Sequence, residues 1–374
     1  MKPIETLLSQ EERITLDLRF LYESHGYSPF KMSKFEEYDL YARNKDFLLS
    51  DTIISFTDTD GRLMALKPDV TLSIIKNIKE DRGGLQKVYY HENIYRVSKD
   101  THTYREFMQL GLECMGLIDL YHLVEVSLLA AASLKAIHSH YILSLSHMGI
   151  LSALLADLSL NWEQEKQILQ FIGEKNRHGI KTVCQQAGSS REACQRLTDL
   201  LAAYGPPKVV LPRLRTICTS EKTASLLDEL ERICQVLTPD HGDSILLDFS
   251  IKGGMNYYNG LVFQGFIQGI PSAVLSGGQY DKLMEKMGKT QGALGFAIYL
   301  DLLDYLGSVQ KDCDIDVLLL YQESTDVTLL IETVKKLQEE GLSVQVQPLI
   351  PEKLKYKKLL QIKGGRLETL ESTD

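Results

Sequence analysis

The chain has 374 residues, of which 44% are hydrophobic and 24% are charged, and its formal net charge is -9. This composition is typical of a globular protein with a large core, and the length suggests two or three domains. The acidic balance argues against a strongly basic nucleic-acid-binding protein, because contacts with phosphate depend on an excess of Lys and Arg, so no nucleic acid is expected as a partner.

The first part of the chain predicts helices that alternate with hairpin strands. Apolar positions at helical spacing run through residues 8–25 and stop at Gly26. The segment 51–64 alternates between polar and apolar residues and contains Asp-Gly at 60–61, which readily supplies the positive φ of a tight turn. The other elements expected here are a strand at 28–32, a helix at 68–78, strands at 87–96 and 106–115, a helix at 119–137 and a strand at 141–146.

The second part begins with helix formers and then returns to strands. Residues 148–239 do not show the alternation of polar and apolar residues that is typical of strands, and they are expected to form helices. Strands are expected at 245–250, 258–266 and 273–275, and the domain is expected to end at 301–306. A small βαβ-like tail follows, with a strand at 315–321, a helix at 325–340, a strand at 342–347 and an irregular polar end from Pro351.

These elements indicate an α+β protein. Strands joined as hairpins argue for an antiparallel sheet and against a doubly wound parallel one. We expect an antiparallel core formed by residues 1–150 and 243–306, a helical insertion at 151–242 and a small α/β tail at 311–374.

Cysteine spacing and hydropathy set the expected compartment. The six cysteines form no CxxC pair and no zinc-type cluster with histidine, so we expect reduced thiols, no metal and a cytoplasmic protein. The N-terminus lacks the apolar core of a signal peptide, and polar residues interrupt the most apolar stretch, 120–137, which predicts a buried helix rather than a membrane span. No motif for a phosphate-binding loop or a dinucleotide is present, so no cofactor is expected.

Polar residues on the predicted strands suggest a binding pocket. Gln109, Gly111 and Glu113 alternate along one strand and therefore share a face. That face is either a solvated outer surface or a pocket floor, and Gly111 favours a floor because a position without a side chain lets a ligand approach. Tyrosines lie beside glycines at Tyr257-Tyr258 and at Gly277-Gly278-Gln279-Tyr280, where ordinary packing and turns are the alternative. Arg96, Lys99 and Arg105 flank a polar loop and could bind phosphate or carboxylate.

Five segments in one order resemble histidyl-tRNA synthetase across residues 5–305. The segment YREFMQLGLECMG is similar to the second motif of class II synthetases, and its QLGxE ending is similar to that of the histidine enzyme. LKPDVT resembles the family's LRPEGT, GGMNYYNGLVF its RGLDYYNxTVF and SGGQYDKL its GGRYDxL, while GALGFAIYLDLL resembles the third class II motif. The resemblance implies a class II synthetase-like antiparallel sheet flanked by helices.

The departures from the family fall on the groups that bind ATP. Where the family has arginines that contact the substrate carboxylate and the phosphates, this chain has Gly253 and Leu302. Lys252 lies one position earlier, and a neighbouring strand residue points to the opposite face. Ser98 replaces the acid of the second motif and Thr103 replaces a loop arginine. The tail is also shorter than the family's anticodon-binding domain, so we expect aminoacylation to be lost.

The amino-acid side of the pocket is better retained. By resemblance, Asp69, Thr71 and Gln109 would hold the α-ammonium group of histidine, although Asp69 is one methylene shorter than the family's Glu. Glu113 and Tyr258 would bind the imidazole and Tyr280 would line the pocket. Arg96, which is retained from the second motif, completes the expected histidine-binding set.

These features are similar to one branch of the family, the regulatory subunits of short-form ATP phosphoribosyltransferase. That resemblance implies a non-catalytic subunit that joins a catalytic ATP phosphoribosyltransferase subunit in the first step of histidine biosynthesis and transmits feedback by histidine. The alternatives are an active or divergent histidyl-tRNA synthetase and a synthetase-like amino-acid sensor or tRNA-binding module. A dimer or higher oligomer is expected, because the first class II motif, here about residues 26–41, forms an interface in the family.

Overall fold

The computed structural model describes residues 8–48, 53–78, 84–97, 102–250, 257–306 and 313–372. The chain divides into two compact units. The larger is Ile14–Leu306, and the smaller combines Gly307–Asp374 with Met1–Arg13.

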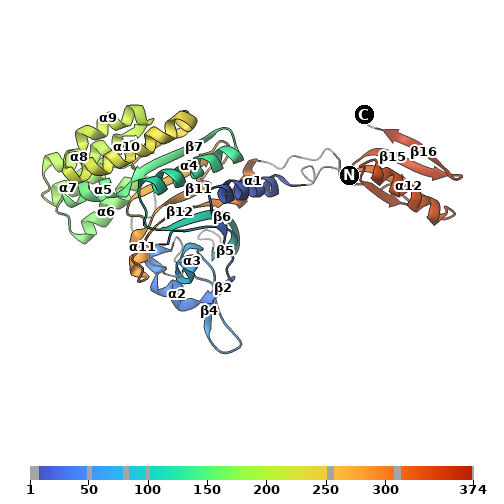
Figure 1. Cartoon of the computed structure of the whole chain (residues 1–374), viewed down its shortest axis with the longest axis horizontal. Coiled ribbons are helices and arrows are strands. Elements are labelled where there is room, and N and C mark those ends of the chain that lie inside the picture. The colour runs from blue at the N-terminus through green and yellow to red at the C-terminus, as the bar shows by residue number, and fades with distance from the viewer. Residues whose placement is uncertain are drawn as a thin grey trace. The chain divides into compact units, whose positions relative to one another are not determined.

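A nine-stranded sheet forms the centre of the larger unit (Figure 1). Its strands are, in spatial order, β1 (Ser28–Pro29), β5 (Gln86–Val97), β6 (Tyr104–Gly116), β12 (Gly292–Tyr299), β11 (Leu275–Gln279), β10 (Leu261–Ile267), β7 (Tyr141–His147), β9 (Ile245–Asp248) and β8 (Tyr204–Gly205). Only the pairs β1–β5 and β7–β9 are parallel among the described neighbours, and the others are antiparallel. The predicted α+β class with an antiparallel sheet is confirmed.

One long helix lies against the middle of this sheet. The helix α4 (Leu120–Ile137) packs on β7, β10 and β12, and Asp119 caps its first turn by accepting a hydrogen bond from the His122 backbone N–H at 3.2 Å. Among the described helices, α4 is the one with the length and apolar composition that could cross a membrane. Ten of its residues are buried, and its apolar ones belong to the hydrophobic core, which agrees with the buried helix predicted from the sequence.

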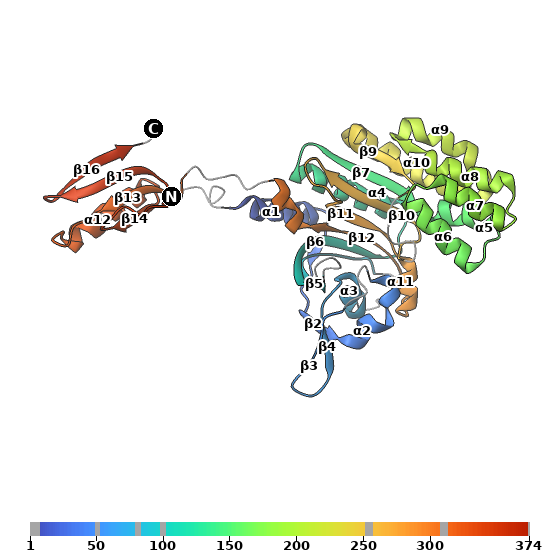
Figure 2. The same cartoon turned by 180° about the vertical axis from the view of Figure 1, so that it is seen from behind.

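A three-stranded sheet and short helices lie beside the strands β5 and β6 (Figure 2). The sheet consists of β2 (Phe35–Glu37), β4 (Leu63–Leu66) and β3 (Ser55–Thr57), and the helices are α2 (Tyr38–Arg43), the short 3-10 helix η2 (Lys45–Phe47) and α3 (Thr71–Asn77). The predicted hairpin is present, with a turn in which Gly61 has a φ of 81° and the Asp58 N–H donates to the Arg62 carbonyl.

Six helices lie between β7 and β9 in the chain, although these two strands are neighbours in the sheet. They are α5 (Met148–Ala156), α6 (Trp162–Gly173), α7 (Arg177–Gln186), α8 (Arg191–Ala202), α9 (Pro207–Ile217) and α10 (Glu221–His241), followed by the 3-10 turn η3 (Gly242–Ser244). Side chains of Asn161, Asn176, Ser190 and Ser220 cap four of them by accepting backbone N–H bonds, which explains why each begins where it does. The separation of this region as an insertion domain remains a prediction.

In the smaller unit, the described residues 313–372 form a four-stranded sheet and one helix. Its elements are β13 (Ile315–Leu320), α12 (Val327–Glu339), β14 (Val344–Gln347), β15 (Tyr356–Lys363) and β16 (Arg366–Ser372), with the sheet order β14-β13-β15-β16. The prediction of an irregular end was wrong. The end forms the hairpin β15–β16, turning at Gly364 and Gly365 with φ of 57° and 76°. It reads as irregular because every residue of the edge strand β16 is exposed, so no buried alternation marks it.

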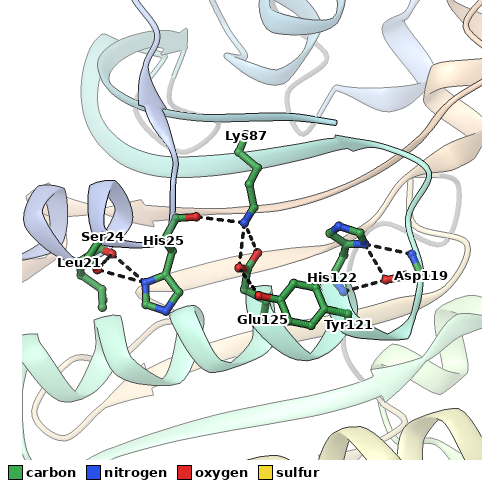
Figure 3. A network of polar contacts seen from close by, with 8 residues as sticks. All are labelled: Leu21, Ser24, His25, Lys87, Asp119, Tyr121, His122 and Glu125. Atoms are coloured by element: carbon green, nitrogen blue, oxygen red, sulfur yellow. Dashed lines mark hydrogen bonds and ion pairs between the residues drawn. The ribbon is translucent and has the colours of Figure 1, made fainter. Parts of the chain in front are cut away.

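A polar network ties the turn after α1 (Gln10–Ser24) to the sheet and to α4 (Figure 3). The Lys87 ammonium on β5 donates to the His25 carbonyl at 3.0 Å and to Glu125 on α4 at 2.8 Å. The Tyr121 hydroxyl donates to the same carboxylate at 3.1 Å. Because Glu125 is almost fully buried, its charge needs this pairing, and the network holds the chain at His25, shortly before the edge strand β1.

Candidate functional site

A cavity of about 340 Å³ opens on the face of the sheet that carries β6 polar residues. It is lined by residues from β5, β6, β10, β11 and β12, from the start of α3 and from the segments just before β10 and α11 (Asp281–Lys286). All seven residues predicted from the sequence line it, namely Asp69, Thr71, Arg96, Gln109, Glu113, Tyr258 and Tyr280. The pocket-floor interpretation of the alternating Gln109 and Glu113 therefore agrees with the geometry.

Gly111 does not itself line the cavity, but its lack of a side chain leaves room for a residue that does. Gly111 on β6 pairs with Tyr90 on β5 and with Ala297 on β12. A Cβ added to Gly111 would lie 2.3 Å from the Phe296 carbonyl oxygen and 2.5 Å from the Tyr90 hydroxyl. Any side chain at Gly111 would collide with the backbone and with Tyr90, so glycine at this position lets the lining residue Tyr90 take its place in the cavity wall.

The Glu113 carboxyl lies at the centre of the hydrogen bonds in the cavity. It accepts hydrogen bonds from the Tyr280 hydroxyl at 2.6 Å and from the Thr71 hydroxyl at 2.8 Å. Its side chain lies over Gly295, where a Cβ would come within 1.7 Å of the carboxyl oxygen. Burial raises the pKa of Glu113 to about 8, although both hydroxyls lower it. This group therefore favours its neutral form near pH 7.

The segment before α3 carries a second carboxyl, Asp69, and Arg96 on β5 lies near it in the lining. Asp69 accepts a hydrogen bond from the Leu72 N–H at 2.9 Å, which shapes the first turn of α3. Burial raises the pKa of Asp69, while the Leu72 N–H and the nearby Arg96 oppose that rise. The Arg96 Nε donates to the Pro68 carbonyl at 3.0 Å, so this guanidinium braces the segment that carries Asp69.

Tyrosines close the remaining wall. The rings of Tyr257 and Tyr258 meet edge to face at 4.7 Å between centroids, and Tyr257 lies 5.6 Å from Tyr280. Tyr280 is almost fully buried and stands just before α11, where its hydroxyl reaches Glu113. The wall offers aromatic surface with hydroxyl groups, which suits a flat ligand with polar edges.

Several lining residues lie outside the predicted set, and four of them are polar residues of the sheet strands. They are Tyr90, Gln264, Ser276 and Tyr299. Three of them share a cross-strand row in which Tyr90 pairs with Gly111, Gly111 with Ala297, Ala297 with Ser276 and Ser276 with Gln264. The periodicity of a single strand cannot find such neighbours, because the row depends on strand order and register. Tyr299 pairs with Gln109 and could have been found only with that register.

The positions where this chain departs from the family's ATP-binding groups divide into those outside the described residues and those within them, which are Thr103 and Leu302. Lys252, Gly253 and Ser98 lie outside the described residues. Leu302 lies in the 3-10 segment η4 (Leu300–Leu306) and packs against the hydrophobic core.

The predicted strand at 273–275 was misplaced, since β11 runs through Gly277 and Gly278, whose lack of side chains allows close contact with Phe296 and Leu261.

The lining can bind a cation or a hydrogen-bond donor better than an anion. It contains two carboxyls, several hydroxyls and, among the described residues, one cationic side chain, Arg96. No cluster of three His, Cys, Asp or Glu residues that could hold a metal occurs in the described part of the chain. An α-ammonium group and an imidazole are the kind of ligand groups that this set of acceptors would recognise.

Comparison with known proteins gives one family. Residues 5–303 match the model of the histidyl-tRNA synthetase family. A regulatory subunit of ATP phosphoribosyltransferase from Caldanaerobacter subterraneus subsp. tengcongensis is 30% identical over 76% of this chain and 75% of its own length. Another from Oceanobacillus iheyensis is 27% identical over 87% of this chain and 82% of its length. A histidine–tRNA ligase of Methanococcus vannielii is 26% identical over 89% and 80%.

Solved structures show the same fold. A protein described as an ATP phosphoribosyltransferase regulatory subunit/histidyl-tRNA synthetase from Bacillus halodurans C superposes with a TM-score of 0.79 at 24% identity, covering 94% of this chain and 93% of that chain. A chain of the ATP phosphoribosyl transferase (HisG:HisZ) complex from Thermotoga maritima has a TM-score of 0.59 at 18% identity, covering 76% and 96%. The class II synthetase-like fold is thereby confirmed.

The buried carboxyl predicts a pH dependence of stability. The folded-state pKa of Glu113 lies above its ordinary value, so its contribution is fully present below about pH 4.5 and is lost as pH rises through about 8. Glu113→Gln does not titrate. Relative to the unchanged chain, this variant should gain on the order of a few kcal/mol of unfolding free energy between pH 5 and pH 8.5.

Urea denaturation at the two pH values measures that gain. Glu285→Gln is the matched control, since Glu285 is exposed and water already hydrates its charge. Parallel stability curves for the chain and Glu113→Gln would show that Glu113 is not held in its neutral form by burial.

Proposed function

This chain belongs to the histidyl-tRNA synthetase family, among relatives that are regulatory subunits of ATP phosphoribosyltransferase, and we propose that it works as such a non-catalytic subunit. Its partner is then the catalytic ATP phosphoribosyltransferase subunit, which performs the first step of histidine biosynthesis. The chain itself is then required for the activity of the complex and for feedback by histidine.

The observation that carries this proposal is the apolar packing of Leu302. Amino-acid activation gathers negative charge on the phosphates of ATP, so preorganised cations must face it. At the aligned position this chain places Leu302 against the hydrophobic core. Among the described lining residues, Arg96 alone is cationic, and its Nε already donates to Pro68. Losing one such donor typically costs a factor of about 100 to 1,000 in rate.

The histidine pocket supports a role for the ligand as an effector rather than a substrate. Asp69, Gln109 and Glu113 line the same cavity as the tyrosines, so the acceptors for an ammonium and an imidazole lie together. An effector shifts a partner only when it binds two states of the complex with different affinities. Histidine in this pocket would therefore act by stabilising the less active state of the assembly.

An active or divergent histidyl-tRNA synthetase is the second candidate. The relatives named histidine–tRNA ligase favour it, since their identity to this chain is similar to that of the regulatory subunits. A synthetase-like amino-acid sensor is a third possibility that shares the same pocket. The three candidates differ in what they require. A synthetase would use ATP to activate histidine, and a sensor would bind histidine without a phosphoribosyltransferase partner.

Reconstitution with a catalytic short-form ATP phosphoribosyltransferase subunit tests the proposal directly. The purified chain should show no phosphoribosyl transfer by itself, should raise the turnover of the catalytic subunit on mixing and should make that turnover sensitive to histidine. It should also show no histidine-dependent exchange of labelled pyrophosphate into ATP. Clear exchange would establish the synthetase instead, and a catalytic subunit that neither binds nor responds would favour the sensor.

Histidine binding should depend on Glu113. Removing this carboxyl by Glu113→Ala takes away a hydrogen bond to the imidazole, and a typical hydrogen bond is worth about 0.5–1.5 kcal/mol, which is roughly a 2- to 12-fold loss of affinity. Titration calorimetry of the chain with histidine measures the change. Glu229→Ala is the control, because Glu229 lies on α10 and pairs with His147 away from the cavity. An unchanged affinity would place the histidine site elsewhere.

The apolar face of α1 supports self-association. Phe20 on this helix is 77% exposed, and Leu16, one turn earlier, is also exposed. The helix leads into the stretch 26–41, where β1 is an open edge of the nine-stranded sheet. We expect a dimer in which a second copy covers this face.

Light scattering should give a dimer mass for the chain and a shift toward the monomer for Phe20→Glu. Leu349→Glu is the matched control, since Leu349 is equally exposed but belongs to the smaller unit. A monomer at micromolar concentration would contradict the expected interface.

A further inference from the structure

A carboxylate behind the tyrosine wall of the cavity connects three parts of the sheet. Asp281, the first residue of α11, accepts a hydrogen bond from the Ala293 N–H on β12 at 2.9 Å. It also accepts from the Gln279 side-chain amide on β11 at 2.6 Å and from the Asn259 side-chain amide at 3.1 Å. Asp281 does not line the cavity, so these bonds join parts of the protein and leave the ligand to other residues.

The contact between Asn259 and Asp281 is reciprocal. The Asp281 backbone N–H donates to the Asn259 Oδ1 at 2.8 Å, while the Asn259 Nδ2 donates to the Asp281 Oδ2. The Asn259 N–H also donates to the Gln279 carbonyl at 3.0 Å. Because both ends of the Asn259 amide are used, this side chain cannot turn over without placing its Nδ2 against a backbone N–H. The segment before β10 is therefore held in one position at the end of β11.

Each member of this pair is the chain neighbour of a tyrosine that lines the cavity. Tyr258 directly precedes Asn259 in the chain. Tyr280 directly precedes Asp281, and its hydroxyl donates to Glu113 at 2.6 Å. The polar pair behind the wall therefore determines where the backbone of both tyrosines lies.

Two glycines leave the space that the pair occupies. A Cβ on Gly260 would overlap the side-chain oxygen of Gln279, and a Cβ on Gly292 would lie 2.9 Å from the Asp281 Oδ1. The end of the Gln279 side chain could move away, but Asp281 is held by three N–H groups. A side chain at position 292 would therefore compete directly with the hydrogen bonds of the pair.

We propose that Asn259 and Asp281 are positioning residues for the ligand, which act through the two tyrosines that they hold in the cavity wall. Neither side chain lines the cavity. Their effect passes through the backbone of Tyr258 and Tyr280, and through the Tyr280 hydroxyl it reaches Glu113. The effect on histidine affinity rests on the proposed function, whereas the effect on the wall is a property of the chain without ligand.

The pair requires a carboxylate at position 281, because three N–H donors point at it. With Asp281→Asn, an NH2 group replaces one oxygen and faces the donors of Gln279 and Asn259. Gln279 can turn its amide over and offer its oxygen, but Asn259 cannot, since the backbone N–H at position 281 needs its Oδ1. Turning the new amide only moves the conflict to the Ala293 N–H. One contact between two donors therefore remains and pushes the segments apart.

Titration calorimetry of the whole chain with histidine tests the pair through a double-mutant cycle. Asp281→Asn and Tyr280→Phe should each weaken histidine binding by about 2- to 12-fold, the value of one typical hydrogen bond. The two changes together should weaken it by clearly less than the product of the single losses, because the hydroxyl that the pair positions is already missing. Losses that multiply would show that Asp281 acts independently of Tyr280 and would overturn the proposal.

Exchange of the two side chains provides a rescue. In the double variant with Asn259→Asp and Asp281→Asn, the carboxylate at position 259 can accept from both the backbone N–H and the amide at position 281, so histidine affinity should largely return. An exchanged pair that binds no better than Asp281→Asn alone would contradict the pairing. Asp316→Asn is the matched control, because this carboxylate accepts the Ser343 N–H at 2.9 Å in the smaller unit, and histidine affinity should stay unchanged.

Amide hydrogen exchange of the chain without ligand distinguishes failure of the pair from failure of the histidine site. The Asn259 and Tyr280 N–H groups donate to backbone carbonyls at 3.0 and 2.9 Å. Asp281→Asn should speed exchange at both amides, and the exchanged pair should slow it again. A chain that shows this change but binds no histidine would refute the histidine pocket and support the positioning of the wall. Unchanged exchange at both amides would overturn the positioning role.

Discussion

The pocket depends on one packing constraint, which is that the Glu113 carboxyl must lie over the neighbouring strand. Gly295 pairs with Glu113 across β6 and β12, and any side chain there would occupy the place of the carboxyl oxygen. Only with that space open can Thr71 and Tyr280 reach the two carboxyl oxygens from opposite elements. The acid is therefore held by the sheet on one side and by the starts of two helices on the other.

The lining around Glu113 carries buried acceptors and hydroxyls with directional partners, which suits the polar edges of a small ligand. Leu302 in η4, at the position that resembles the third motif of the family, packs against the hydrophobic core and is not one of the lining residues of this cavity. Arg96 lies near Asp69, and its Nε donates a hydrogen bond to the Pro68 carbonyl, so this side chain stabilises the segment that carries Asp69.

Local patterns predicted the elements and one face of the pocket, but not its full circumference. Period-two alternation was sufficient to place Gln109 and Glu113 together, and the order of five motifs was sufficient for the class II fold. Tyr90 was not predicted, because its pairing with Gly111 on the neighbouring strand can be known only from the strand register. The glycines at 277–278 were interpreted as a possible turn, although they belong to the strand β11. The hairpin β15–β16 was predicted to be irregular, because its outer strand is exposed and shows no alternation of buried residues. In each case the missing information is a contact distant in sequence.

The parallel pairing of β7 with β9 has an evolutionary consequence. Leu143 and Ile245 are paired in neighbouring strands, yet all six helices α5–α10 lie between them in the chain. The segment that contains these helices therefore begins and ends at neighbouring strands of the sheet. A change in its length does not alter the register of the strands around the pocket. Homologues should be able to lengthen, trim or exchange these helices while the ligand-binding sheet stays the same, which makes this region a natural place for partner-specific divergence.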